Sequence, residues 1–345
     1  MNISNFGLLN KLQYLCKMAT KFKKYVIRPV RDSIVYGLLW SVITLSRFMP
    51  RKFLLAWHGF AARQLYLLMP KTRQVIEHNL EFVFGPEKQA GEYREFGREV
   101  YASLAKTFTD YAILSKKKTR EQFSKYFNIS GEEHLRKAYD EGKGVICLVP
   151  HTHGWEFSAI LPPILGYRTT GVSSPIKNKA LDHMMVNLRE SRGMRDVERY
   201  RCYNTLVDRL KSGECLIMMI DHDSKSIKGE FLQFFGHQAY TPIGCARLAI
   251  ETGAKVVPMY TIRNSETDSY TFEILPEVPI VTKSDTTETF RYNTQIYNDI
   301  IESIIRKYPK QWVWMQERWK TTPEILKRYL DAKEKERQQK ESENQ

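Results

Sequence analysis

The sequence is poor in cysteine and histidine. Its 345 residues include 5 Cys and 8 His, and no two cysteines stand in a CxxC pair. Cys147 and Cys215 lie inside apolar runs, where a cysteine usually acts as a small hydrophobic residue. The composition therefore excludes a disulfide-stabilised scaffold, argues against a structural zinc site and indicates a reducing compartment.

The sequence also lacks a recognisable signal peptide and an apolar run long enough to cross a membrane. No small-residue cleavage site follows the lysine-rich start. The uncharged run at residues 33–46 is shorter than the roughly 20 residues that a spanning helix needs. A second apolar stretch at residues 53–69 is interrupted by Arg63. Neither stretch is therefore a strong candidate for a transmembrane helix.

Both stretches nevertheless have the surroundings of a membrane-associated segment. Aromatic and basic side chains, which favour the interface of an anionic bilayer, lie in them and beside them: Tyr36, Trp40, Trp57, Tyr66, Arg28, Arg31, Arg47, Arg51 and Lys52. We predict that residues 1–70 form basic and apolar helices that anchor the protein in one leaflet from the cytosolic side. A buried helical hairpin is the alternative.

The net charge is +14, with an isoelectric point near 9.4. This balance suits an anionic partner: a nucleic acid, an anionic membrane surface or an acidic protein. The basic residues gather near the apolar and aromatic segments rather than on a separate motif, which argues against nucleic-acid binding. An anionic membrane surface is the partner that we expect.

Strand-like and helix-like segments alternate after residue 125. Buried strands are predicted at residues 145–149, 215–220, 255–262 and 270–275. Helices are predicted at residues 33–125, 242–252, with Pro242 in the first turn and Gly253 as its stop, and 292–308. This order predicts an α/β fold, a mixed sheet flanked by helices. The charged tail at residues 323–345 is nearly free of apolar residues from Ala332 onward, so we expect it to be frayed or disordered.

The most informative stretch, Val-Pro-His-Thr-His-Gly-Trp-Glu, ends at Glu156 and directly follows the first predicted strand. Its His151 and Glu156 form an H-x4-E pair. A neutral imidazole can take the proton of a hydroxyl that attacks a thioester, and a carboxylate can orient the imidazole and stabilise its charged form. The spacing alone is also met by chance in solvated loops, but its position at a strand end favours a catalytic role for both residues.

A second polar cluster, Asp221-His222-Asp223, follows the second predicted strand. Two readings are open at this point. The cluster can simply cap the end of the strand, or His151, His153, Asp221 and Asp223 can hold a metal ion, which would make the protein a metal-dependent hydrolase.

Further segments bear on this choice. In chain order they are residues 178–193 with Asn178, Leu181, Asp182, Arg189 and Gly193, then GEFLQFFG at 229–236, TPIGCARLA at 241–249 and PKQWVWMQERWK at 309–320. Together with the H-x4-E pair they resemble the lipid A biosynthesis acyltransferase family, in the lysophospholipid acyltransferase superfamily. The resemblance covers residues 30–322 and explains the histidines without a metal.

The resemblance implies a fold like that of glycerol-3-phosphate acyltransferase, with the acyltransferase domain at residues 71–322. It implies transfer of a fatty acyl group from a thioester donor, acyl carrier protein or coenzyme A, to a hydroxyl of a membrane lipid or glycolipid, without a cofactor. His151 and Glu156 are then catalytic. The residues expected to bind substrate are His153, Trp155, Lys177, Asn178, Arg189, Asp221 and Arg318. Arg189 and Arg318 are expected to bind lipid phosphates or carboxylates through their guanidinium forks.

This sequence departs from the family pattern at two places. His153-Gly154 stands where the family often has Gly-Asn, and Gln316-Glu317 precedes Arg318 where histidine and arginine are usual. The departures bear on the acceptor more than on the reaction. The expected location is the bacterial inner membrane, with the catalytic domain on the cytoplasmic side, where a basic face would attract the acidic carrier protein.

Overall fold

The computed structural model describes residues 48–85, 90–114, 117–200 and 202–343, together with Gly37, Ser41, Thr44 and Leu45. Most of the apolar run at residues 33–46 lies outside the described residues, so its predicted membrane association is not addressed by the structure. The second apolar stretch is a described helix, α3 (Arg51–Leu68). Within the described part of the chain, none of the helices combines the length and apolar character needed to cross a bilayer.

The predicted α/β fold is confirmed, with a seven-stranded mixed sheet in the order β1-β9-β8-β2-β5-β3-β4. Only β8 and β9 pair antiparallel; the other neighbours are parallel. The strands are β1 (Phe127–Ser130), β2 (Val145–Leu148), β3 (Thr169–Ser173), β4 (Met194–Glu198), β5 (Cys215–Met218), β8 (Lys255–Arg263) and β9 (Tyr270–Ile274). β2 is central, and β5 and β8 pair with its two edges.

Strand β2 is continuously apolar because both of its faces are covered. Ile146 and Leu148 belong to one hydrophobic core, whereas Val145, Cys147 and Val149 belong to the other. Successive side chains of a strand point to opposite faces, so an uninterrupted apolar run is what a strand between two helical layers requires.

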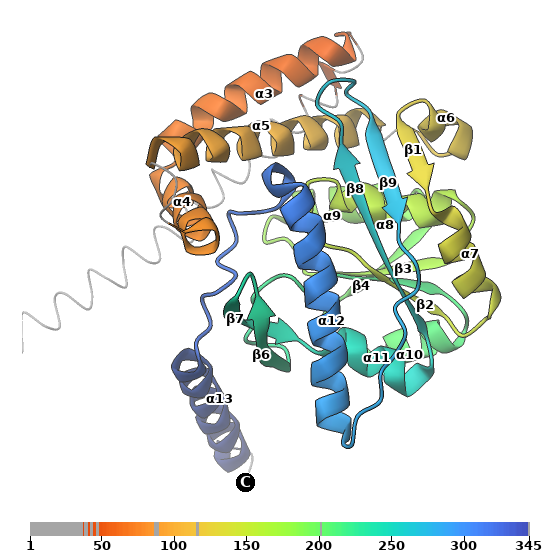
Figure 1. The fold of residues 1–345 in the computed structure, drawn as a ribbon, viewed down its shortest axis with the longest axis vertical. Coiled ribbons are helices and arrows are strands. Elements are labelled where there is room, and N and C mark those ends of the chain that lie inside the picture. The colour runs from red at the N-terminus through yellow and green to blue at the C-terminus, as the bar shows by residue number, and fades with distance from the viewer. Residues whose placement is uncertain are drawn as a thin grey trace, which may run out of the picture.

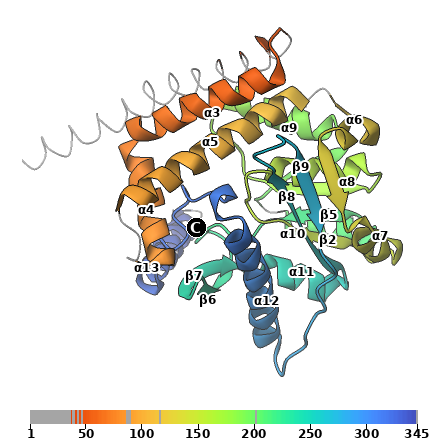
Figure 2. The same cartoon turned by 45° about the horizontal axis from the view of Figure 1, so that its top comes forward.

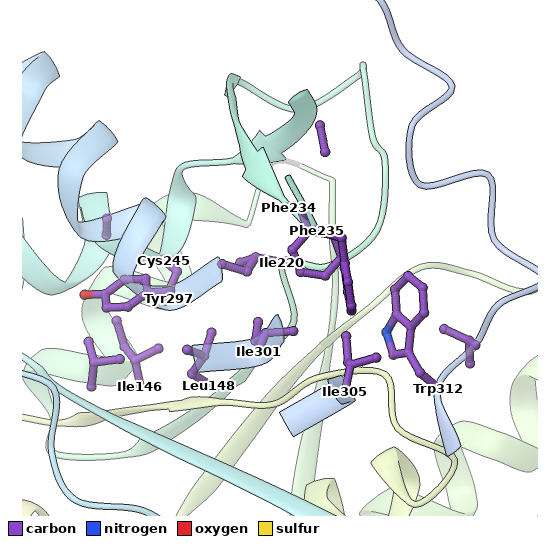
Figure 3. Packing of buried hydrophobic residues seen from close by; sticks show 14 of the residues in the cluster. Ile146, Leu148, Ile220, Phe234, Phe235, Cys245, Tyr297, Ile301, Ile305 and Trp312 are labelled. Carbon is purple, nitrogen blue, oxygen red and sulfur yellow. The ribbon is translucent and has the colours of Figure 1, made fainter. Parts of the chain in front are cut away.

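Helices form these two layers (Figures 1 and 2). The first core contains residues of α10 (Tyr203–Lys211), α11 (Gly244–Thr252) and α12 (Thr286–Lys307). The second contains residues of α7 (Glu132–Asp140), α8 (Trp155–Ile164) and α9 (Lys179–Glu190). Figure 3 shows the first core at close range, where Ile301 of α12 lies beside Leu148 and Ile305 lies nearer the Trp312 ring.

An N-terminal helical layer of α3, α4 (Pro70–Phe84) and α5 (Ala90–Leu114) covers one end of the sheet. Arg51 fixes this layer, because its guanidinium donates to both oxygens of the buried Asp110, at 2.6 and 2.7 Å. The Tyr270 hydroxyl also donates to Asp110, at 2.7 Å. Helices α3 and α5 are thereby tied to strand β9, and the start of α3 is held against the edge region of the sheet.

A separate hairpin, β6 (Gly229–Phe234) and β7 (His237–Pro242), contains the Phe-Phe-Gly segment. Phe235 and Gly236 are its two central turn residues, with φ of 55° and 76°. A two-residue turn with positive φ at both positions matches the twist of the paired strands. Phe235 can hold this uncommon conformation because its ring is buried, 6.1 Å from the ring of Trp314.

Two predictions about secondary structure are wrong. Pro242 is the last residue of β7, and α11 begins at Gly244, although Gly253 ends the helix in the left-handed conformation as predicted. The C-terminal tail is helical, as α13 (Pro323–Glu343), and stands apart from the sheet in both views. Charged pairs at helical spacing, such as Arg337 with Glu334 at 2.9 Å, support this exposed helix without apolar packing.

Candidate active site

The strand register brings two polar segments together. In the parallel pair of β2 and β5, Leu148 lies opposite Met218. His151 and Asp221 each stand three residues beyond these partners, at the same edge of the sheet. Parallel strands with this register must place both residues outside the carboxyl ends of neighbouring strands, which is the usual site of ligands in α/β sheets.

Asp221 orients His151. The Nδ1 atom of His151 is 2.7 Å from Oδ1 of Asp221, and the backbone N–H of His151 donates to Oδ2 at 2.8 Å. The indole N–H of Trp312 also donates to Oδ2, at 2.8 Å. The carboxylate thus fixes the imidazole, and Nε2 is the ring nitrogen left for the pocket.

Asp221 is completely buried, but it stays charged. Burial alone would raise its pKa, but the neighbouring His151 and the hydrogen bonds from His151 and Trp312 hold the pKa well below its usual range. The fixed negative charge can therefore stabilise an imidazolium formed on His151.

His222 forms a second support for the imidazole. Its ring stacks on that of His151 with a centroid separation of 3.5 Å and an interplanar angle of 12°. Burial, and then the neighbouring His151, lowers the pKa of His222 to about 3, so this ring is neutral near pH 7. Trp155 lies on another side of His151, with ring centroids 5.9 Å apart. The imidazole is therefore held by stacking as well as by Asp221.

Glu156 does not have the partner that the sequence predicted. Its two oxygens accept from Nε and Nη2 of Arg189, at 2.9 and 2.6 Å, and Oε1 also accepts from the indole N–H of Trp155 at 3.1 Å. Arg189 donates further to Asp196, at 2.8 Å. The expectation that Glu156 orients His151 is wrong, because the carboxylate of Glu156 is paired with Arg189. The Nδ1 atom of His151 is bonded to Asp221 instead.

His151 faces a pocket of about 710 Å³. Its apolar part is lined by residues such as Ala159, Val172, Met194, Leu206, Ile217 and Leu248. Its polar part contains His151, Glu156 and Arg189, and also Ser173, Arg199 and Ser224. Residues at or just beyond the carboxyl ends of β2, β3, β4 and β5 line the pocket together with residues of α8, α10 and α11, so the pocket lies at the edge of the sheet where the His151–Asp221 pair lies.

Three residues predicted to contact substrate lie elsewhere. His153 is 2 % exposed, its Nδ1 lies 2.9 Å from Oγ of Ser103, and burial lowers its pKa to about 3. Arg318 is 0 % exposed, donates to the backbone oxygen of Tyr240 at 2.7 Å, and is too deeply buried to meet a lipid. Asn178 caps α9, because its side chain accepts from the Leu181 N–H at 3.0 Å.

The other predicted residues lie at or beside the pocket. Trp155 and Arg189 line it, although two carboxylates neutralise Arg189. Lys177 is exposed and follows Ile176, a residue of the pocket rim. Asp221 lies behind His151 and not on the pocket surface, so its place is that of a positioning residue rather than a substrate contact.

The four residues of the metal-site alternative do not converge. Both oxygens of Asp223 accept from Thr321, at 2.6 and 2.7 Å, while His153 is directed to Ser103. Among the residues that the structure describes, no group of three or more His, Cys, Asp and Glu side chains could hold a metal ion. The hydrolase reading is therefore not favoured.

Sequence reasoning missed several residues of the site. The strand-end position of His222 was visible, but its stacking on His151 depends on the pairing of β2 with β5. Trp312 lies about ninety residues from its partner Asp221, so only the folded chain reveals the bond. Arg199 carried no signal at all, because one arginine beside a short strand resembles any surface arginine.

The fold and this site define an α/β enzyme with a histidine–aspartate pair at the mouth of a partly apolar pocket. Residues 19–321 match the model of a family described as bacterial lipid A biosynthesis acyltransferase, and the chain belongs to this family of enzymes. The expected resemblance is confirmed.

Known relatives agree with this assignment. The chain is 28 % identical over 261 residues to a lipid A biosynthesis acyltransferase of Haemophilus influenzae, covering 75 % of this chain and 77 % of that protein. It is 26 % identical over 296 residues to the lipid A biosynthesis lauroyltransferase of Escherichia coli, covering 84 % and 90 %. It is 30 % identical over 193 residues to a phosphatidylinositol mannoside acyltransferase of Mycolicibacterium smegmatis, covering 54 % and 60 %.

Proposed function

We propose that the enzyme moves a fatty acyl group from a thioester donor to a hydroxyl of a membrane glycolipid such as a lipid A precursor, with His151 as general base. His151 takes the proton of the hydroxyl as its oxygen attacks the thioester carbonyl. The carbon–sulfur bond then breaks, the new ester forms, and the imidazolium returns the proton to the departing thiolate. The observation that carries the proposal is the bond from His151 Nδ1 to Asp221, which leaves Nε2 for the acceptor.

Asp221 and Trp312 support this step without touching substrate. The buried carboxylate keeps the proton of the neutral imidazole on Nδ1, so Nε2 has a free lone pair. It then stabilises the positive charge that appears on the ring. The indole N–H of Trp312 holds the carboxylate in place. A positioned base of this kind contributes about 10²- to 10⁴-fold in rate.

The pocket supplies room for the acyl chain. Its apolar residues extend from the mouth near His151 to Leu206 and Leu248 between the sheet and its helices. Burial of an acyl chain contributes about 0.8 kcal/mol of favourable free energy per methylene group, so an apolar pocket of this kind favours long fatty acyl groups over short ones. Glu156 and Arg189 form one polar wall and keep it rigid through two charged hydrogen bonds.

We propose acyl carrier protein as the donor and the inner membrane as the location, with the active site on the cytoplasmic side. The donor is consistent with the net charge of +14, which favours an acidic partner. Membrane association is consistent with α3, whose Phe53, Trp57, Phe60 and Leu68 side chains are between 50 and 77 % exposed. The exposed Lys52 and Lys71 stand at the two ends of this apolar face.

The test is mass spectrometry of the host's membrane lipids, with the gene deleted and with the deletion complemented by wild type or His151→Ala. The proposal predicts that one lipid loses the mass of one acyl chain in the deletion strain, and that only the wild type restores it. Restoration by His151→Ala would contradict the assigned base. An unchanged lipid profile in the deletion strain would contradict a membrane-lipid acceptor.

A further inference from the structure

The rings of His151 and His222 stack face to face where both residues line the pocket. Their centroids lie 3.5 Å apart and their planes are inclined by 12°, which is van der Waals contact between the two rings. His151 follows β2 and His222 follows β5, and these strands are parallel neighbours. The register of the two strands therefore brings the rings together.

The His222 ring is neutral near pH 7. Burial, and then the neighbouring His151, lower the pKa of His222 to about 3; Arg318 acts in the same direction, whereas Asp221 opposes them. The Nε2 atom of His222 is buried and has no hydrogen-bond partner among the described residues. A proton on this nitrogen would therefore have no acceptor within the described part of the protein.

A proton taken up by the pair belongs to His151. Its Nδ1 is 2.7 Å from Oδ1 of Asp221, so the carboxylate favours a positive charge on this ring. Two charged rings in contact would repel each other, which keeps a second proton off His222. Whenever His151 is protonated, its positive charge thus lies against the face of a neutral aromatic ring.

A neutral aromatic face attracts a cation. The face carries the negative part of the ring's quadrupole, and the attraction grows where water is excluded. Both conditions are met at this pair, because the rings are nearly parallel and the side chain of His151 is only 16 % exposed. The His222 ring is therefore suited to stabilise the imidazolium of His151.

The other ionisable groups near the pair have partners of their own. Glu156 of α8 and Arg189 of α9 pair with each other at 2.6 Å. Arg318 of the C-terminal block is buried and donates to the backbone oxygen of Tyr240 at 2.7 Å. These groups stay the same when His222 is replaced, so differences among His222 variants report on the stacked ring.

We propose that His222 is a positioning residue whose neutral aromatic face stabilises the protonated form of His151 and so makes His151 a stronger base. The inference rests on the proposed role of His151 as general base and adds a second support for its charge beside Asp221. No bond forms or breaks at His222. The proton passes from the acceptor hydroxyl to Nε2 of His151 and then to the departing thiolate.

The test is a pH titration of the histidine rings by NMR, with full-length protein in a neutral detergent and isotope-labelled histidine. The chain contains 8 His, and the signal of His151 is the one that disappears in His151→Gln. His222→Phe keeps an aromatic face, whereas His222→Leu and His222→Gln remove it. His237→Leu is the matched control, because His237 also stacks on an aromatic ring, that of Phe82 at 3.8 Å, but lies outside the pocket.

We expect the titration midpoint of His151 to fall by about one pH unit in His222→Leu and in His222→Gln, since the lost attraction is that of a largely desolvated cation for an aromatic face. His222→Phe and His237→Leu should keep the wild-type midpoint. The rate of acyl transfer from a lauroyl-acyl carrier protein to a lipid A precursor should fall by up to about tenfold in the two non-aromatic variants alone. Thermal unfolding curves confirm that each variant is folded, and using two non-aromatic replacements keeps the test valid if one of them does not fold.

An unchanged or higher midpoint in the non-aromatic variants would overturn the proposal. So would an equal fall in His222→Phe, because a ring that only fills space or holds the loop does not depend on the choice between these replacements. The titration needs neither donor nor acceptor, so its outcome is independent of the proposed function. The proposed function fails instead if His151→Ala retains transfer.

Discussion

Replacing Asp221 by Asn tests the part of the site that departs most from the sequence prediction. The carboxylate accepts three N–H bonds: two from His151, at 2.7 and 2.8 Å, and one from Trp312, at 2.8 Å. Asn offers one acceptor oxygen and an NH₂ group, which must face at least one of these donors. The imidazole loses both its fixed tautomer and the charge that stabilises its protonated form.

The expected loss in kcat is about 10²- to 10⁴-fold, the range of a positioned base. The KM for the acceptor should change little, because Asp221 lies behind His151 and not on the pocket surface. Initial rates of acyl transfer with purified protein give both constants. Asp223→Asn is the matched control, since Asp223 belongs to the same strand end but bonds to Thr321.

The reasoning would be refuted if Asp221→Asn kept wild-type kcat, or if Asp223→Asn lost as much activity with its fold intact. A thermal unfolding curve for each variant distinguishes a loss of catalysis from a loss of folded protein. A buried donor left unpaired costs about 1–3 kcal/mol, so Asp221→Asn should also unfold earlier than wild type. Its remaining folded fraction must still show the low kcat.

Three further predictions follow from the same geometry. Glu156→Gln weakens the charged partner of the buried Arg189, so it should destabilise the fold by about 1–3 kcal/mol and reduce kcat less than Asp221→Asn does; a larger kcat loss at unchanged stability would return the orienting role to Glu156. Burial holds the pKa of His153 at about 3, below the unfolded value of about 6.5. As the pH falls below about 6.5, the unfolded chain therefore binds a proton at His153 that the fold excludes, and this residue alone lowers the stability by about 1.4 kcal/mol per pH unit until about pH 3. Urea unfolding at several pH values gives the slope of the unfolding free energy against pH, which should correspond to one proton less in His153→Asn than in wild type. Equal slopes in the two proteins would contradict a buried, neutral His153. Trp57→Asp should reduce flotation of the protein with anionic vesicles, whereas unchanged flotation would exclude the exposed face of α3 as a membrane contact.

The sheet could be predicted largely because its central strands are short, apolar and bounded by turns. The predicted strands at residues 145–149, 215–220, 255–262 and 270–275 correspond to β2, β5, β8 and β9. The edge strands β1 and β4 are partly exposed and mix polar with apolar residues, and β3 contains two threonines and a glycine, so these three strands lack this signal. A strand that is buried on both faces has a continuous apolar run, which is easier to recognise in a sequence than the pattern of a strand buried on one face.

The sequence predicted key residues of the candidate site but not which of them form hydrogen bonds with one another. The sequence places His151 and Asp221 at strand ends, but only the register of β2 with β5 decides that they meet. Glu156 appeared closer to His151 because it follows within the same motif. Glu156 lies in the first turn of α8, where its carboxylate accepts from Arg189 of α9, thirty-three residues later in the chain.

Burial explains why Arg318 was assigned wrongly. A lone arginine in a polar segment resembles a surface residue, yet here the segment folds under the hairpin. Its charge lies over the ring of Phe234, 4.9 Å from the centroid, and its N–H groups satisfy Tyr240 and Thr241. Sequence composition gives no means of separating such a buried, structural arginine from Arg199, whose side chain reaches the pocket.

The most direct test of the central claim is a single-turnover measurement of acyl transfer from a lauroyl-acyl carrier protein to a glycolipid acceptor. Wild type and His151→Gln are compared at equal folded concentration, and the acylated lipid is quantified by mass spectrometry. The account predicts a mass increase of one acyl chain with wild type and a rate at least about 10²-fold lower with His151→Gln. Transfer by His151→Gln at the wild-type rate would contradict it.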